Sequence, residues 1–194
     1  SDGVLPGSFR DPSGFLFRKD GVLYRQINRS YREHYDLFLK SGLYERLVAG
    51  GLLVPHEEDD LSLARTAEAY RVIRPMPVPF VSYPYEWSFS QIKDAALLTL
   101  DIQRRALAAG MTLKDSSAFN VQFAGGRPVF IDTLSFEPYV EGRPWTPYQQ
   151  FCRHFLATLA LMSYRDVRFS QLLRVHLDGV PLDLASAQLP FRSR

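Results

Sequence analysis

Cysteine is almost absent from this chain, because Cys152 is the single one among 194 residues. An internal disulfide bond is therefore excluded. No apolar run reaches the length of a membrane span, and even the stretch 156–162 is short and flanked by charged residues. No N-terminal stretch has the charged, apolar and small-residue order of a signal peptide. These absences predict a cytoplasmic protein without a membrane span.

An excess of charge of one sign is missing as well. The 23 Lys and Arg residues nearly balance the 21 Asp and Glu residues, which leaves a formal net charge of +2. Although the tail 191–194 is basic, this even scatter gives no strong signal for nucleic-acid binding. The chain is instead rich in apolar residues, with 46% hydrophobic and 13% aromatic side chains. That composition predicts a buried core, in one domain or in two small lobes.

The most informative stretch is 113–136, which reads LKDSSAFNVQFAGGRPVFIDTLSF. Asp115 is followed by Asn120, and then by two short apolar strands that would fold back at a Gly-Gly turn. The hairpin would bring Asn120 and Asp132 to the same end. Three side chains with oxygen ligands would then converge, which is the pattern that phosphoryl-transfer chemistry uses.

This arrangement resembles the catalytic loop and metal-binding strand of the protein-kinase-like fold, especially its aminoglycoside-phosphotransferase branch. The resemblance implies that Asp115 orients or deprotonates an acceptor hydroxyl, and that Asn120 and Asp132 hold Mg²⁺ on the phosphates of ATP or GTP. Two positions depart from the family pattern, since Leu113 replaces the usual His and Thr133-Leu134 replaces the usual Gly. Ordinary turn chemistry, with the three residues capping turns and ending a strand, is the alternative interpretation.

The first part of the chain would form a small antiparallel sheet. A hairpin over 14–27, turning at Asp20-Gly21, would be followed by strands over 70–73 and 78–82. The acidic stretch 54–69 is predicted as a solvated loop or helix start. In the kinase resemblance, Arg25 takes the place of the Lys that pairs with nucleotide phosphates, and a guanidinium can bind phosphate as well.

Two further expectations concern the ends of this sheet. The stretch 6–14 would take the place of the phosphate-covering loop, but it lacks the spaced glycines of such loops, and a solvated loop is the alternative. Ser30 followed by Glu33 predicts a capping box at the start of a helix.

A boundary is predicted near residue 83, between a sheet-bearing lobe over 1–83 and a helical lobe over 84–194. In the resemblance, Tyr83 and Tyr85 occupy the hinge between lobes, where they either contact the nucleotide base or pack one lobe on the other. Ser88 and Gln91 form a second capping box, which opens a long amphipathic helix that ends at Gly110. An apolar helix is expected from Pro147 to Met162.

Longer stretches, including SGFLFRKDGVLYRQINRSYREHYD and VPFVSYPYEWSFSQIKDAALLTL, resemble the N-terminal portion of a bacterial family of SAM-dependent methyltransferases or nodulation-protein-like proteins. The resemblance implies an N-terminal module whose attached methyltransferase domain lies beyond residue 194, so that the chain is a fragment of a longer protein. S-adenosylmethionine is not expected to bind this chain, because no glycine-rich turn follows a first strand as such a site requires.

Two functions remain open from the sequence. One is an α+β, two-lobe kinase-like enzyme that uses Mg²⁺ and ATP or GTP to phosphorylate a small molecule, a glycan or a protein. The other is a pseudokinase-like binding or regulatory module that serves an attached methyltransferase domain without turnover.

Overall fold

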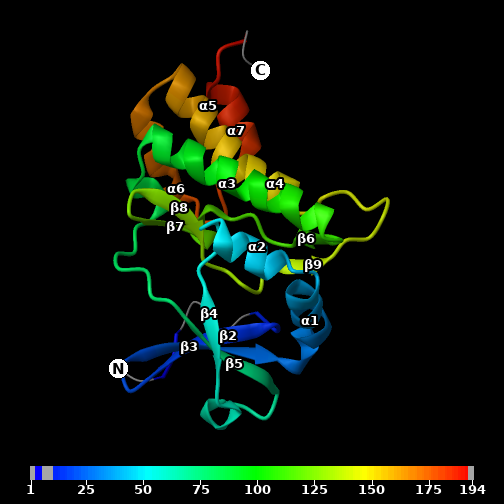
Figure 1. Cartoon of the computed structure of the whole chain (residues 1–194). Helices are drawn as coiled ribbons and strands as arrows, with labels where there is room; N and C mark the ends of the chain where they lie inside the picture. The colour runs from blue at the N-terminus through cyan, green and yellow to red at the C-terminus, as the bar shows by residue number, and fades with distance from the viewer. Residues whose placement is uncertain (1–2, 6–10, 192–194) are drawn as a thin grey trace.

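The computed structural model describes residues 3–5 and 11–191, and shows a mixed α+β chain. An antiparallel sheet built from the first 75 residues lies at one end in Figure 1. Helices from the second half of the chain lie at the other end, and α1 (Arg32–Lys40) and α2 (Leu43–Ala49) lie between them. The prediction of a small antiparallel sheet followed by a largely helical part is confirmed at this level.

The sheet has five strands in the order β1-β2-β3-β5-β4, and every neighbouring pair is antiparallel. Its strands are β1 (Gly3–Val4), β2 (Gly14–Lys19), β3 (Val22–Asn28), β4 (His56–Asp59) and β5 (Ala69–Pro75). The predicted β2–β3 hairpin is confirmed, with Lys19 opposite Val22. Its two turn residues, Asp20 and Gly21, have φ angles of 51° and 77°. Positive φ at both positions matches the right-handed twist of the flanking strands.

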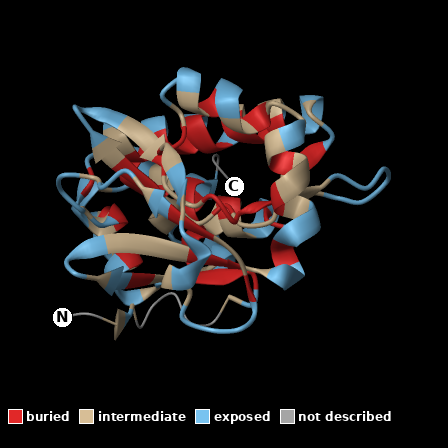
Figure 2. Cartoon of the chain, turned by 60° about the horizontal axis from the view of Figure 1, so that its bottom comes forward, coloured by how far each residue is buried: buried red, intermediate tan, exposed pale blue. Residues whose placement is uncertain are grey.

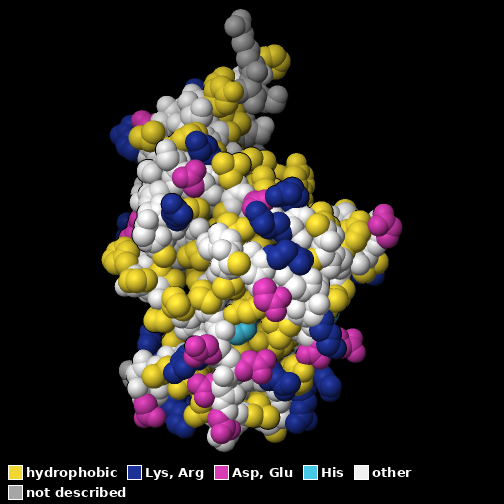
Figure 3. All heavy atoms as spheres, viewed as in Figure 1, with side chains coloured by type: hydrophobic (Ala, Val, Ile, Leu, Met, Phe, Trp, Pro, Cys, Tyr) yellow, Lys and Arg dark blue, Asp and Glu magenta, His cyan; other side chains and the backbone are white. Residues whose placement is uncertain are grey.

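Two predictions fail in this region. The acidic stretch was expected to be a solvated loop or helix start, yet His56–Asp59 forms the edge strand β4. Cross-strand charge explains the difference, because Glu57 and Glu58 lie 2.6 and 3.2 Å from Arg74 and Arg71 of β5. Figure 3 shows the resulting mixture of acidic and basic side chains over this end of the molecule. Residues 78–82, expected as a strand, have no regular structure, and Pro77 and Pro79 cannot donate ladder hydrogen bonds.

The helical part begins with α3 (Phe89–Ala108), whose predicted capping box is confirmed. The Ser88 hydroxyl accepts a bond from the Gln91 amide at 3.3 Å, and the Gln91 side chain accepts one from the Ser88 amide at 2.9 Å. Two small two-stranded sheets follow: β6 (Met111–Leu113) with β9 (Phe136–Pro138), and β7 (Val121–Ala124) with β8 (Arg127–Phe130).

The remaining helices are α4 (Tyr148–Phe151), α5 (Ala157–Tyr164), α6 (Leu172–Val175) and α7 (Leu182–Gln188), with a π-helical turn at Cys152–Leu156 joining α4 to α5. The apolar helix expected from Pro147 to Met162 is thus present, with that turn inside it. Short 3-10 helices lie at Arg29–Tyr31, Leu61–Leu63, Pro84–Glu86, Ala118–Asn120 and Val167–Gln171. Within the described ranges, no helix has the length and hydropathy that crossing a bilayer requires.

The start of α1 differs from its prediction. Ser30 does not cap this helix; its hydroxyl donates to the carbonyl of Pro12 at 2.8 Å, and α1 begins at Arg32. The reason is tertiary, because the segment before β2 packs against the end of β3 and offers a carbonyl to the hydroxyl. The predicted capping box is therefore wrong at this helix.

The main core joins α1, α2 and α3 to the small strands β6 to β9. Phe38 of α1 stacks on Phe136 of β9, with ring centroids 4.4 Å apart, and both side chains are fully buried. Close by, the Tyr31 hydroxyl donates to the Phe136 carbonyl. Figure 2 shows the buried residues gathered on the inner faces of the strands and helices. This packing fixes α1 and the sheet it follows relative to β9.

We expect Phe38→Ala to lower the free energy of unfolding by about 3 to 5 kcal/mol, because it removes a buried ring and leaves a cavity against Phe136. Leu97→Ala on the outer side of α3 is the control, since this side chain is 56% exposed. Its effect should stay within about 0.5 kcal/mol. Urea denaturation followed by circular dichroism measures both, and equal losses in the two variants would contradict the assignment of the core.

His56 of β4 is a half-buried histidine that contacts two tyrosines. Its Nε2 lies 2.9 Å from the Tyr35 hydroxyl, and its backbone amide donates to the Tyr44 hydroxyl at 2.9 Å. Burial, together with the charge of Arg25, lowers the pKa of His56 from 6.5 to about 4.

Because the unfolded chain binds a proton on His56 at a higher pH than the folded chain, we expect stability to be lost as the pH falls from 6.5 to about 4. The contribution of this residue is about 2 to 3 kcal/mol. Thermal melts of His56→Gln should show a shallower decline over this pH window than the unchanged chain. An identical pH profile for both proteins would show that His56 is not the group responsible.

Candidate functional site

Asp115, Asn120 and Asp132 line one cavity of about 710 Å³, as the sequence led us to expect. Arg25 and Lys114 line it too, together with apolar side chains from both parts of the chain. The wall on one side comes from β2 and β3, and the opposite wall from the segments that follow β6 and β8. The cavity is therefore a cleft between the sheet and the helical part.

Local hydrogen bonds position the first two of these residues. Asp115 follows β6, and its carboxylate accepts a bond from the Ser117 amide at 2.8 Å. A 3-10 turn then brings Asn120 to the start of β7. The β7–β8 hairpin returns the chain so that the Ile131 amide donates to the Asn120 carbonyl at 2.8 Å. The Asp115 side chain therefore both caps a turn and lines the cleft.

Asp132 is held by a set of donors in the cleft. Arg25 forms an ion pair with its carboxylate, and the side chains of the two residues are only 13% and 20% exposed. The Ser135 hydroxyl also donates to this carboxylate, and the Leu134 amide does so at 3.3 Å. Burial acts to raise the pKa of Asp132, but Arg25 and these hydrogen bonds together hold it below its ordinary value.

Asp115 has the opposite electrostatic character. Burial, with the nearby charge of Asp132, raises the pKa of Asp115 above its ordinary value, against the lowering effect of the hydrogen bond from Ser117. Two carboxylates in one cleft therefore differ in proton affinity. This is the arrangement in which one of a pair exchanges protons while the other stays ionised.

The cleft offers oxygen atoms of the type that Mg²⁺ takes, although Arg25, Ser135 and the Leu134 amide already contact the Asp132 carboxylate. The Asp132 carboxylate and the Asn120 amide provide hard oxygen atoms, and both side chains contact the hydroxyl of Ser135, Asn120 at 3.4 Å. Within the described ranges no group of three or more His, Cys, Asp or Glu residues surrounds a metal position. Mg²⁺ suits such a sparse set, because it commonly takes one or two protein oxygens and completes its shell with water and substrate phosphates.

A second, mostly apolar cavity of about 530 Å³ continues the cleft. It shares Leu5, Leu16, Arg25 and Ile131 with the polar cavity. The rest of its wall comes mainly from β2, β3 and the segment 73–81, where Met76 and Val81 are among the most exposed apolar side chains. The cleft as a whole therefore has one apolar end and one charged end, with Arg25 at their junction.

Tyr83 and Tyr85 lie elsewhere, since neither is among the residues that line these two cavities. Their rings stack on each other, 5.4 Å apart and nearly parallel. Tyr85 packs against the buried cluster of α5 and α7, and its carbonyl accepts a bond from Gln171 at 2.8 Å. These contacts lie within the helical part, so they show neither contact with a nucleotide base nor packing of one lobe on the other. The segment 73–81 borders the cleft instead.

Two residues of the site were not singled out from the sequence. Lys114 stands next to Asp115 in the motif. The sequence did not show that its side chain points into the cleft, because this direction depends on how β6 lies relative to the five-stranded sheet. Ser135 contacts both Asp132 and Asn120, and the only signal for this in the sequence was its position three residues after Asp132.

Of the expected phosphate-covering loop, residues 6–10 lie outside the described part of the chain, while Asp11 and Gly14 line the cleft.

No family model matches the chain. The chain is similar to a nodulation protein. It is 38% identical over 181 residues to nodulation protein NoeA of Rhizobium meliloti (strain 1021), an alignment that covers 92% of the chain and 38% of the relative. The chain thus spans less than two fifths of that relative's length. The expected nodulation-protein-like resemblance is supported, and the comparison does not bear on a kinase-like or methyltransferase role.

We expect Arg25→Gln to lower the free energy of unfolding by about 3 kcal/mol, because Asp132 is then left as a partly buried carboxylate without its counter-charge. Arg104→Gln is the matched control, since Arg104 pairs with Asp101 at 2.6 Å but is 74% exposed. Its loss should not exceed about 1 kcal/mol. Chemical denaturation at neutral pH compares the two, and a loss for Arg25→Gln no larger than that of the control would contradict a tight pair.

Proposed function

We propose that this chain is a two-lobe, protein-kinase-like domain that binds ATP or GTP with Mg²⁺ in the cleft and places an acceptor hydroxyl at Asp115. The observation that carries the proposal is the convergence of Asp115, Asn120, Asp132 and Arg25 on one cavity. Three of these residues lie within the segment 115–132, and Arg25 comes from the distant strand β3. Their types are those that position and neutralise a nucleotide's phosphates in phosphoryl transfer.

The shape of the cleft suits a ligand with two unlike ends. A nucleotide joins a flat, largely apolar base to a charged phosphate chain. The apolar cavity of about 530 Å³ would take the base, and the charged cavity would take the phosphates. Arg25 lines both, so its guanidinium lies where the phosphate chain would begin. A guanidinium can bind phosphate oxygens through two parallel hydrogen bonds.

The chemistry assigned to the chain's own residues is modest. Asp115 accepts a hydrogen bond from the acceptor hydroxyl and takes its proton as the new oxygen–phosphorus bond forms. The bond from the terminal phosphorus to the bridging oxygen breaks, and the nucleoside diphosphate leaves. Arg25 balances charge on the phosphates. Mg²⁺, held by Asn120 and Asp132, would supply further charge neutralisation. The acceptor is a small molecule, a glycan or a protein.

A second candidate is a pseudokinase-like binding module that serves an attached methyltransferase domain. The observation that favours it is the direct pairing of Arg25 with Asp132, which engages the proposed metal ligand within the chain itself. Leu113 in place of the usual His, and Thr133-Leu134 in place of the usual Gly, point the same way. A chain similar to 38% of a longer relative is compatible with a module of this kind.

Calorimetric titration of ATP and of GTP, with and without Mg²⁺, tests the nucleotide site. We expect binding that requires Mg²⁺, and a loss of at least about tenfold in affinity for Asp132→Asn, because the variant removes a charged metal ligand. Asp94→Asn, an exposed carboxylate on α3, is the matched control and should bind like the unchanged chain. If neither nucleotide binds, the phosphotransferase is wrong, and a structural or partner-binding module remains.

Asp115→Asn separates the two candidates. In the enzyme, this variant keeps nucleotide binding and loses turnover, measured as release of nucleoside diphosphate. In the binding module, the unchanged chain already binds nucleotide without turnover, and the substitution changes neither.

A further inference from the structure

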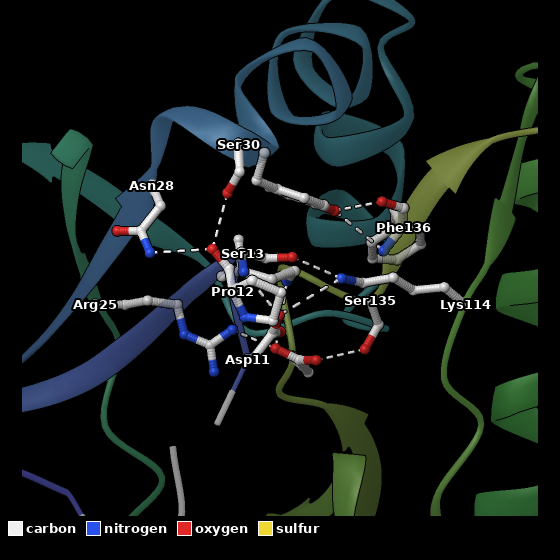
Figure 4. Close-up of polar contacts among 12 residues, drawn as sticks. Asp11, Pro12, Ser13, Arg25, Asn28, Ser30, Lys114, Ser135 and Phe136 are labelled. Carbon is white, nitrogen blue, oxygen red and sulfur yellow. Dashed lines mark hydrogen bonds and ion pairs between the residues drawn. The ribbon is translucent and has the colours of Figure 1, made fainter. Parts of the chain in front are cut away.

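Lys114 places a second positive charge in the cleft. Its ammonium group donates to the Ser13 hydroxyl at 2.8 Å and lies 3.9 Å from the Asp11 carboxylate. It also lies over the ring of Tyr31, 5.0 Å from the centroid. Figure 4 shows Arg25 and Lys114 reaching into this region from opposite sides. Both residues line the cavity that holds Asp115, Asn120 and Asp132.

The two cations are neutralised to different degrees. Arg25 is tightly paired with Asp132, whose other donors are Ser135 and the Leu134 amide. Lys114 and Asp11 are 27% and 40% exposed, and the distance between their charged atoms is at the long end for an ion pair. Exposed pairs of this kind contribute little free energy. An anion that enters the cleft can therefore replace Asp11 beside Lys114 at small cost.

The segment that carries Asp11 does not depend on Lys114 for its position. The Pro12 carbonyl accepts bonds from the Asn28 side chain at 3.0 Å and from the Ser30 hydroxyl at 2.8 Å, as Figure 4 shows. The Asp11 carboxylate also accepts a bond from the Ser13 amide at 2.8 Å. The loop is thus fixed to the sheet, and the contact with Lys114 can be exchanged while the loop stays in place.

We propose that Lys114 is a second phosphate-binding group of the cleft, that it holds the terminal phosphate of a nucleoside triphosphate, and that the Asp11 carboxylate takes the place of this phosphate beside Lys114 when no phosphate is bound. The inference rests on the proposed function. Carboxylate and phosphate oxygens are both strong acceptors for an ammonium group. The cavity lining holds two cations against three carboxylates, a balance that opposes a polyphosphate until Asp11 is neutralised or displaced.

Substitution of Lys114 and substitution of Asp11 should change the affinity for ATP in opposite directions. Calorimetric titration with Mg²⁺ and ATP, and separately with Mg²⁺ and ADP, is carried out on the chain and on five variants. Lys114→Gln should weaken ATP binding about tenfold while ADP binding changes by less than about threefold. Asp11→Asn should strengthen ATP binding about threefold, because it removes a competing negative charge. In the double variant the gain from Asp11→Asn should disappear, since the two residues act on one phosphate.

Lys93→Gln and Asp94→Asn are matched controls that make the same charge changes on the exposed face of α3. Both should leave ATP and ADP affinities unchanged. The inference is overturned if Lys114→Gln melts like the unchanged chain and binds ATP equally well, or if Asp11→Asn weakens ATP binding. Should Lys114→Gln fail to fold, Asp11→Asn decides alone. A chain that binds ATP and ADP alike, with Mg²⁺ and Asp132 required, contradicts only this inference, whereas a chain that binds no nucleotide contradicts the proposed function as well.

Discussion

The ion pair between Arg25 and Asp132 is the constraint on which the cleft depends. It joins strand β3 of the sheet to the segment after β8, and both side chains are largely removed from water. A carboxylate in that setting is costly unless a counter-charge and hydrogen bonds compensate it. Ser135 and the Leu134 amide complete the compensation, and Ser135 also contacts Asn120. Arg25, Ser135 and, through Ser135, Asn120 are thus arranged around this one carboxylate.

Apolar packing holds the two walls of the cleft at a fixed separation. The stacked rings of Phe38 and Phe136 join α1 to β9, and the Tyr31 hydroxyl bonds the Phe136 carbonyl. Because Tyr31 follows β3 directly and Phe136 lies four residues after Asp132, these contacts position the same two segments that the ion pair connects. Charge and packing therefore reinforce one geometry, in which one cleft carboxyl has a raised pKa and the other a lowered one.

Most local features of the fold could be read from the sequence. The turn at Asp20-Gly21 and the capping box of α3 depend on residues within four positions of one another, so their chemistry is visible in a short window. The errors arose where a distant partner outweighed the local pattern. The acidic stretch became strand β4 because Arg71 and Arg74 lie opposite it. Ser30 turned from helix capping to the Pro12 carbonyl for the same kind of reason.

For the site, the sequence by itself determined that Asp115, Asn120 and Asp132 would meet, since one 3-10 turn and one hairpin connect them within a few tens of ångströms of chain. It also offered Arg25 as a phosphate-binding cation. Only the tertiary structure decided that Arg25 pairs with Asp132, that Lys114 lies beside Asp11, and that the segment 73–81 rather than Tyr83 and Tyr85 borders the cleft. These contacts join residues far apart in the chain. Pairing of their charges is favoured because burial makes an unpaired charge costly, and this burial exists only once the sheet packs against the helical part.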